Sequence, residues 1–149
     1  MPTEIEGSLG EEIAKKGGEV GATTGRPRRC GWFDAVSVKR IIQSNSVSAL
    51  CLTKIDVLDG LENIKICTGY NEDESKKAFA ECMELEDVNP SYIEIEGWPE
   101  PTAGINNYDD FPQKAKNFVE KIAEVCGVPV DIISTGPDDA STILINQEI

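Results

Sequence analysis

The chain has 149 residues, the length of one ordinary domain, and its 40% apolar content is enough for a hydrophobic core. Its 27 acidic and 14 basic residues give a formal net charge of −13, which argues against general binding to nucleic acids or anionic membranes. No apolar run approaches the roughly 20 residues that cross a bilayer, and the N-terminus lacks the features of a signal peptide, so we expect a cytoplasmic protein.

The cysteines stand far apart in the sequence, and the chain has no histidine to complete a zinc site with them. We therefore expect reduced thiols, several of them in the core. They are Cys30, Cys51, Cys67, Cys82 and Cys126.

Residues 1–18 are rich in Gly, Glu and Lys and are expected to be largely a surface segment. The run at residues 21–32, GATTGRPRRCGW, then places three arginines beside glycines and threonines. Glycines let a backbone approach a ligand, threonine hydroxyls donate hydrogen bonds, and guanidinium groups match carboxylates and phosphates. We predict an anion-binding loop here; the alternative is a basic surface turn that offsets acidic neighbours.

Apolar residues recur at helical spacing from Ala35 to Asn45, and Asp34 is a suitable N-cap, so a helix is predicted directly after this loop. Residues 48–53 form a nearly continuous apolar run, which is typical of a strand buried on both faces of a parallel sheet. Such a strand places Lys54 and Asp56 at its carboxyl end, where ligands bind in open α/β sheets.

A second strand is predicted over residues 64–70, and the charged residues 71–77 are interpreted as a solvated turn. Residues 92–96 alternate between apolar and acidic side chains, which indicates a half-exposed strand that the following Gly97-Trp98-Pro99 ends. We interpret Trp98 as a packing residue rather than a platform for stacking a base.

Apolar residues from Ala115 to Cys126 share one face of a predicted helix that Gly127 caps. Strands are predicted at residues 130–133 and 141–145, with a turn over residues 134–139. This order of elements predicts an α/β fold.

The GATTGRPRRCGW run, TKIDVLDG at residues 53–60 and STGP at residues 134–137 together resemble the adenylosuccinate synthetase family. The resemblance covers nearly the whole chain but only about the C-terminal third of the family's length. It implies the C-terminal part of a mostly parallel sheet with flanking helices, incomplete with respect to the synthetase fold, which is similar to that of P-loop NTPases. It also implies a place in AMP and purine biosynthesis: a homodimeric ligase that makes adenylosuccinate from IMP and L-aspartate, hydrolyses GTP to GDP and phosphate, and uses Mg²⁺.

By this resemblance the arginine loop receives L-aspartate, with Arg26 on the substrate carboxylate and on IMP and with Arg28 approaching GTP. The implied loop residues are Ala22, Thr23, Thr24, Gly25, Arg26, Pro27 and Arg28. The implied GTP-binding residues are Arg28, Lys54, Ile55, Asp56, Ser134, Thr135 and Gly136.

The Asp56 carboxylate can accept hydrogen bonds from the ring N–H and the exocyclic amine of guanine, and adenine has no matching pair of donors. Lys54 can lay its aliphatic stem and its cation across the purine face. The alternatives are an ordinary solvated loop pair at Lys54 and Asp56 and a strand-ending turn before Pro137.

The family keeps its glycine-rich phosphate loop, catalytic aspartate and catalytic histidine in its N-terminal portion, and this sequence has none of these motifs. We therefore expect no catalytic residue and no metal ligand in this chain, Mg²⁺ bound by the N-terminal portion, and no activity from the chain alone. The opening Pro2-Thr3-Glu4 is typical of the middle of the family sequence, so we expect a cut or mis-assigned longer chain. The alternatives are a stand-alone guanine-nucleotide-binding or regulatory module and a non-functional remnant.

Overall fold

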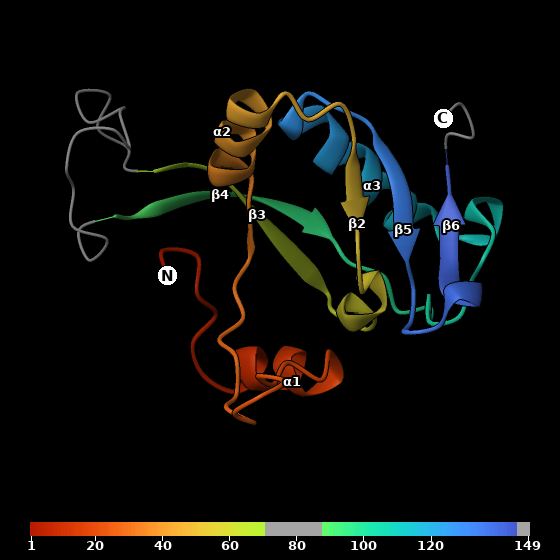
Figure 1. Ribbon diagram of the computed structural model, residues 1–149, viewed down its shortest axis with the longest axis horizontal. Helices are drawn as coiled ribbons and strands as arrows, with labels where there is room; N and C mark the ends of the chain where they lie inside the picture. Colours follow the sequence, from red (N-terminus) through yellow and green to blue (C-terminus); the bar gives the residue numbers. More distant parts are fainter. Residues whose placement is uncertain (71–87, 146–149) are drawn as a thin grey trace. The chain divides into compact units, whose positions relative to one another are not determined.

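The computed structural model describes residues 1–70 and 88–145 (Figure 1). The chain divides into two compact units, the first within residues 1–37 and 65–94 and the second within residues 38–64 and 95–149. The predicted turn at residues 71–77 lies outside the described residues, as does Cys82.

The first unit contains helix α1 (Ser8–Lys16), strand β1 (Phe33–Asp34) and most of strands β3 (Asn63–Tyr70) and β4 (Pro90–Glu96). The order of its sheet is β1-β3-β4, and β1 runs parallel to β3 with Phe33 opposite Ile66. The strands predicted at residues 64–70 and 92–96 are thus confirmed.

Residues 1–18 are largely at the surface, as expected, but they contain helix α1, which was not predicted. Ile13 is buried, and Gly10 lies so close to the preceding chain that a Cβ atom there would be 2.0 Å from the carbonyl oxygen of Ile5. The helix is short, with nine residues, but its apolar residues lie at helical spacing. The available signal was the spacing of Leu9 and Ile13, followed by lysines in the last turn.

The second unit contains most of helix α2 (Ala35–Asn45), strand β2 (Leu50–Leu52), the 3₁₀ turn η1 (Ile55–Leu58), helix α3 (Gln113–Cys126), and strands β5 (Val130–Ser134) and β6 (Thr142–Leu144). Two further 3₁₀ turns are η4 (Tyr108–Asp110) and η5 (Asp139–Ser141). The order of the sheet is β2-β5-β6, in which β2 runs parallel to β5 and β6 antiparallel to β5 (Figure 1).

The α/β class is confirmed, but the described strands form two three-stranded sheets instead of one mostly parallel sheet. Strand β6 is antiparallel because the turn after β5 is too short for the crossover that a parallel strand requires. The expected burial of β2 on both faces is wrong. Cys51 is exposed between the half-buried Leu50 and Leu52, and β2 lies at the edge of its described sheet.

Both predicted helices are confirmed with their caps. Asp34 caps α2 by accepting a hydrogen bond of 3.0 Å from the backbone N–H of Ser37. Gly127 ends α3 in the left-handed conformation and donates its N–H to Ala123. Phe118 of α3 lies 5.7 Å from Trp98 between ring centroids, and Trp98 is fully buried, so its role in packing is also confirmed.

Asp59 connects the turn after β2 with the segment that follows β4. Its carboxylate accepts three hydrogen bonds of 2.7 Å, from Trp98 Nε1 and from the backbone N–H and hydroxyl of Thr102. Gly97 adds a close backbone approach, since a Cβ atom there would lie 1.9 Å from the carbonyl oxygen of Leu61. These contacts fix the position of the chain segment that follows β2.

Among the described residues, no helix combines the length and the apolar character that a membrane crossing requires.

We predict that Asp59→Ala lowers the free energy of unfolding by about 3 kcal/mol or more, because it leaves the buried donors of Trp98 and Thr102 unpaired. Urea unfolding followed by tryptophan fluorescence measures this change. The control is Asp109→Ala, which removes an exposed carboxylate and should change stability by no more than about 0.5 kcal/mol. Equal effects of the two substitutions would contradict the prediction.

Candidate functional site

Two of the predicted motifs meet at one edge of the sheet in the second unit. Strand β2 leads into Lys54 and Asp56, and the parallel strand β5 ends at Ser134. Because Leu52 is opposite Ile133, both segments leave the sheet at the same edge. The backbone N–H of Lys54 donates a 3.0 Å hydrogen bond to the hydroxyl oxygen of Ser134, although the two residues are 80 positions apart.

Lys54 adopts the left-handed conformation, with φ 58° and ψ 41°. A residue with a Cβ atom pays about 1–2 kcal/mol for this conformation, so surrounding contacts have to stabilise it. The next residue, Ile55, is only 3% exposed and anchors η1 in the core. The side chain of Ile55 therefore serves packing, and only its backbone is left for a ligand.

Asp56 has the one buried side-chain nitrogen or oxygen atom without a hydrogen-bond partner among the described residues, its Oδ1. A buried, unpartnered carboxylate oxygen costs free energy because it has lost water and gained no donor. Recognition of guanine by this carboxylate stays a prediction.

Thr135 is built into the fold. It is 1% exposed, its hydroxyl donates to the carbonyl oxygen of Ile105 at 2.7 Å, and its backbone N–H donates to Ser141 at 2.9 Å. A hydroxyl has one proton, so the side chain of Thr135 has no donor left for a base. Gly136 lies against Ser141, where a Cβ atom would come within 3.0 Å of the serine Oγ.

The arginine loop belongs to the first unit and forms a short hairpin. Val20 pairs with Pro27, and Gly21 donates its N–H to Arg26 at 2.9 Å and accepts from Gly25 at 2.8 Å. Gly25 has φ 63°, which glycine adopts without strain. The predicted loop residues are all exposed, namely Ala22, Thr23, Thr24, Gly25, Arg26, Pro27 and Arg28.

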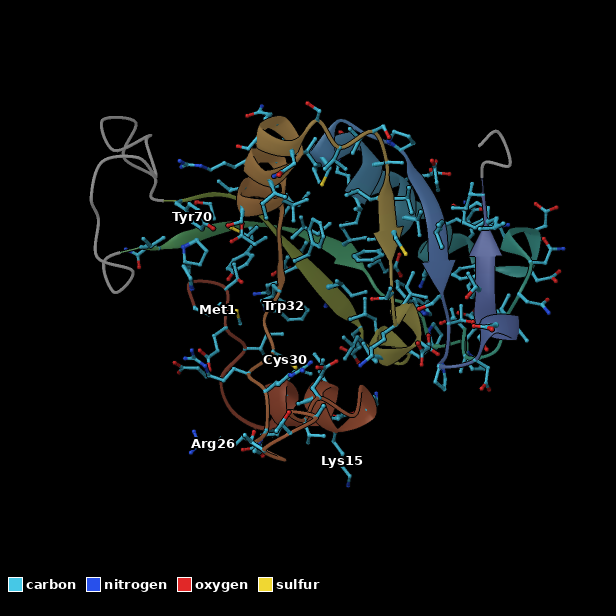
Figure 2. The ribbon with its side chains drawn as sticks, in the orientation of Figure 1. Met1, Lys15, Arg26, Cys30, Trp32 and Tyr70 are labelled. Carbon is cyan, nitrogen blue, oxygen red and sulfur yellow. The ribbon has the colours of Figure 1, made fainter. Side chains whose placement is uncertain are left out.

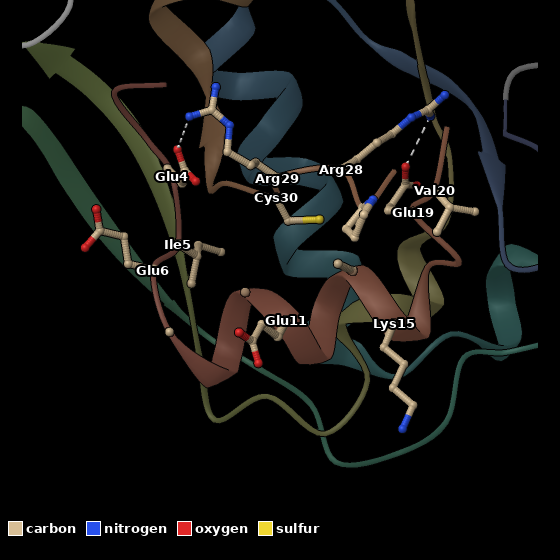
Figure 3. Close-up of a pocket in the computed structure, with 14 residues that line it drawn as sticks. Glu4, Ile5, Glu6, Glu11, Lys15, Glu19, Val20, Arg28, Arg29 and Cys30 are labelled. Carbon is tan, nitrogen blue, oxygen red and sulfur yellow. Dashed lines mark hydrogen bonds and ion pairs between the residues drawn. The ribbon is translucent and has the colours of Figure 1, made fainter. Parts of the chain in front are cut away.

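The three arginines of this region differ in their electrostatic surroundings. Arg28 pairs with Glu19 at 3.3 Å, and Arg29 pairs with Glu4 at 2.9 Å (Figure 3). Arg26 extends outward from the loop (Figure 2), and no carboxylate among the described residues forms an ion pair with it. Arg26 is therefore the loop cation that is best able to receive an anion without first breaking an ion pair.

The two glutamates that pair with these arginines are not apparent as site residues from the sequence, because neither lies in a recognisable motif. They line a cavity of about 510 Å³ between the N-terminal segment, α1 and the loop (Figure 3). Charges of both signs line this cavity, with Lys15, Arg28 and Arg29 facing four glutamates. The paired charges leave no strong excess of one sign inside it.

At the start of α2, the predicted N-cap Asp34 has two side-chain partners that the sequence did not indicate. The Tyr70 hydroxyl and the Ser37 hydroxyl both donate to Asp34 Oδ2. Burial, together with the hydrogen bond to Asp34, raises the pKa of Tyr70, so the phenol keeps its proton. We interpret the cluster as a reinforced helix cap.

The described cysteines are free thiols, as expected, and burial raises the pKa of Cys67 and of Cys126. Within residues 1–70 and 88–145, no group of three or more Asp, Glu or Cys side chains could hold a metal ion. The described residues thus do not fit a magnesium site.

Comparison with known proteins gives a consistent result. Residues 1–143 match the model of the adenylosuccinate synthetase family. The adenylosuccinate synthetase of Nitrosomonas eutropha is 50% identical over 99% of this chain and 35% of its own length. That of Psychrobacter cryohalolentis is 52% identical over 99% of this chain and 34% of its own length.

A solved structure of fully ligated adenylosuccinate synthetase from Plasmodium falciparum is similar with a TM-score of 0.89 and 32% identity, over 98% of this chain and 36% of that one. The chain thus spans about a third of the length of the relatives that it matches.

We predict that Thr135→Val lowers the free energy of unfolding by about 1–3 kcal/mol, because the Ile105 carbonyl loses its buried donor while the side-chain volume is kept. Chemical denaturation measures the change. The matched control is Thr142→Val on the neighbouring strand, where the side chain is exposed and the cost should be within about 0.5 kcal/mol. If Thr135→Val were as stable as the control, the structural role of this hydroxyl would be wrong.

Proposed function

Because this chain belongs to the adenylosuccinate synthetase family, we propose that it forms the portion of such an enzyme that recognises the guanine of GTP and binds L-aspartate and IMP. One observation carries the proposal. Two motifs that are 80 residues apart are hydrogen-bonded at one sheet edge, beside the unpartnered carboxylate oxygen of Asp56.

In the proposed base site, the Asp56 carboxylate accepts from the ring N–H and the exocyclic amine of guanine. Each is a charge-assisted bond of about 1.5–3 kcal/mol, and adenine cannot supply both donors. The exposed Lys54 covers the purine face with its stem and cation. Ser134 and the backbone of Gly136 border the base at the end of β5, since the hydroxyl and the backbone N–H of Thr135 are already used inside the fold.

In the proposed substrate loop, Arg26 pairs with the carboxylate of L-aspartate and reaches IMP, while the hydroxyls of Thr23 and Thr24 donate hydrogen bonds. Two observations support this role of Arg26: the side chain is exposed, and no carboxylate among the described residues forms an ion pair with it. Arg28 approaches the GTP side. Because Arg28 is paired with Glu19, binding there exchanges one carboxylate partner for an anionic ligand.

The reaction of the family phosphorylates the 6-oxygen of IMP and then displaces phosphate with the amine of aspartate. These steps need an acid, a base, Mg²⁺ and a phosphate cradle. We assign all four to the N-terminal two-thirds of the family's length, because this chain has no histidine and no glycine-rich phosphate loop. The chain alone then does not turn over, and the homodimer belongs to the full-length enzyme.

A chimera tests the proposed function directly. This chain replaces the region that it matches in the Nitrosomonas eutropha relative, and adenylosuccinate formation from IMP, aspartate and GTP is measured. We expect product from the chimera and none from the isolated chain. An inactive but folded chimera, or turnover by the chain alone, would overturn the division of labour proposed here.

We predict that Asp56→Asn in this chimera raises the KM for GTP about 10- to 100-fold, because an amide donor then faces the guanine amine. The KM for IMP should change far less. The matched control is Asp109→Asn, which makes the same charge change at an exposed site and should leave both constants unaltered. Normal use of GTP by the Asp56 variant would refute the base site.

We predict that Arg26→Leu raises the KM for aspartate at least about 10-fold, because a charge-assisted contact to the substrate carboxylate is lost. Initial rates at varied aspartate concentration measure this constant. Arg40→Leu removes an exposed arginine of α2 and serves as the control. Unchanged aspartate kinetics in the Arg26 variant would remove this residue from the substrate site.

A further inference from the structure

We propose that Ser134 is a positioning residue, whose hydroxyl holds the left-handed backbone of Lys54 and thereby sets the direction from which Asp56 meets a guanine base. The inference rests on the proposed function. It goes beyond a direct contact between Ser134 and the base, because it assigns the serine to an internal hydrogen bond.

Lys54 has a strained backbone conformation. Among the described residues, only Ser46 and Lys54 are non-glycine residues with a positive φ. A lysine remains in this conformation only where its neighbours hold it there. The strained residue lies at the point where β2 has ended and η1 begins, two positions before Asp56.

Two hydrogen bonds hold Lys54 in this conformation. The Lys54 N–H donates to the Ser134 hydroxyl oxygen at 3.0 Å, and the Lys54 carbonyl accepts from Val57 at 3.2 Å. The strained peptide is thus fixed on both sides, by β5 through the serine and by the first turn of η1. The next residue, Ile55, is buried and anchors the start of η1 in the core.

The position of Ser134 is itself fixed by strand pairing and by the contacts of the next residue. Ser134 is the last residue of β5 and is paired with Thr142 of β6. The next residue, Thr135, is anchored by its buried hydroxyl and backbone N–H. A hydroxyl on such a support can define the position of the residue that donates to it.

The consequence concerns guanine selectivity. Without the serine hydroxyl, Lys54 can relax out of the left-handed region, and the backbone that leads to Asp56 then turns. A carboxylate that is displaced in this way no longer meets both guanine donors. We therefore expect Ser134→Ala to reduce discrimination between guanine and adenine nucleotides, even though the Asp56 side chain is unchanged.

The first experiment measures the backbone itself, without nucleotide. Amide hydrogen exchange in this chain should be at least 10-fold faster at Lys54 in Ser134→Ala, and unchanged in the core strand at Ile133. Ser48→Ala, which removes an exposed hydroxyl of the same unit, is the control and should leave the Lys54 amide as it is. Unaltered exchange at Lys54 in Ser134→Ala would overturn the proposal.

The second experiment separates this role from a direct contact with the base. The ratio of the inhibition constants of ADP and GDP is measured in the active chimera, with Ser134→Ala placed in the Lys54→Ala and Lys54→Gly backgrounds. Both backgrounds lack the lysine side chain, but only glycine adopts the left-handed conformation without strain. We expect about a 10-fold loss of the ratio with alanine and less than 3-fold with glycine.

Equal losses in the two backgrounds would overturn the positioning role and leave a direct contact. If the chimera with the natural Ser134 and Lys54 showed no preference for GDP, the proposed base site would be wrong. The exchange measurement would still decide whether Ser134 holds Lys54. The two failures are therefore distinguishable.

Discussion

The parallel pairing of β2 with β5 is the constraint on which the candidate base site depends. It aligns Leu52 with Ile133, so the chain leaves both strands at the same edge. Lys54 and Ser134 then need only a single hydrogen bond to be joined across 80 residues of sequence. A shift of this register by one residue would turn each side chain to the other face and separate the two motifs. The Asp59 network stabilises the segment that follows β2 and η1, since it ties this segment to the buried donors of Trp98 and Thr102.

The two units present their proposed binding residues by different physical means. The proposed base site lies at the end of paired strands, where buried residues such as Ile55 and Thr135 fix the backbone. The arginine loop is an exposed hairpin that two ion pairs and a few backbone hydrogen bonds hold in place. Exposed ion pairs of this kind contribute little stability, about 0–1 kcal/mol, so exchanging one for a ligand carboxylate costs little. The loop is therefore suited to changing partners, whereas the sheet edge has a more rigid backbone, as the proposed discrimination between bases requires.

The sequence predicts those elements of this structure whose signals are local, and it does not predict contacts between residues that are far apart in the chain. Helices α2 and α3 are predictable because their apolar spacing and their caps, Asp34 and Gly127, are local. Helix α1 was not predicted, although Leu9 and Ile13 lie at helical spacing, because the helix is short and the close approach of Gly10 to Ile5 is not visible in the sequence. The role of Thr135 also escapes sequence reasoning, since its partner Ile105 is 30 residues away and the motif suggests a ligand contact instead. The residues proposed to contact ligands thus lie in motifs that the sequence shows, whereas the residues that position them do not.

The magnitudes also explain why recognition of guanine alone is not expected to give tight binding. Two charge-assisted hydrogen bonds contribute about 3–6 kcal/mol together, whereas association costs at least about 4 kcal/mol in lost translational and rotational freedom. A net charge of −13 further opposes the approach of a polyanionic nucleotide. The sheet edge can therefore decide which base is accepted, but the affinity has to come from groups that bind the phosphates. In the family, the proposed division between this chain and the phosphate-binding portion makes base selection and nucleotide affinity separate properties, so that selection at Asp56 takes effect only when the two portions act on the same nucleotide.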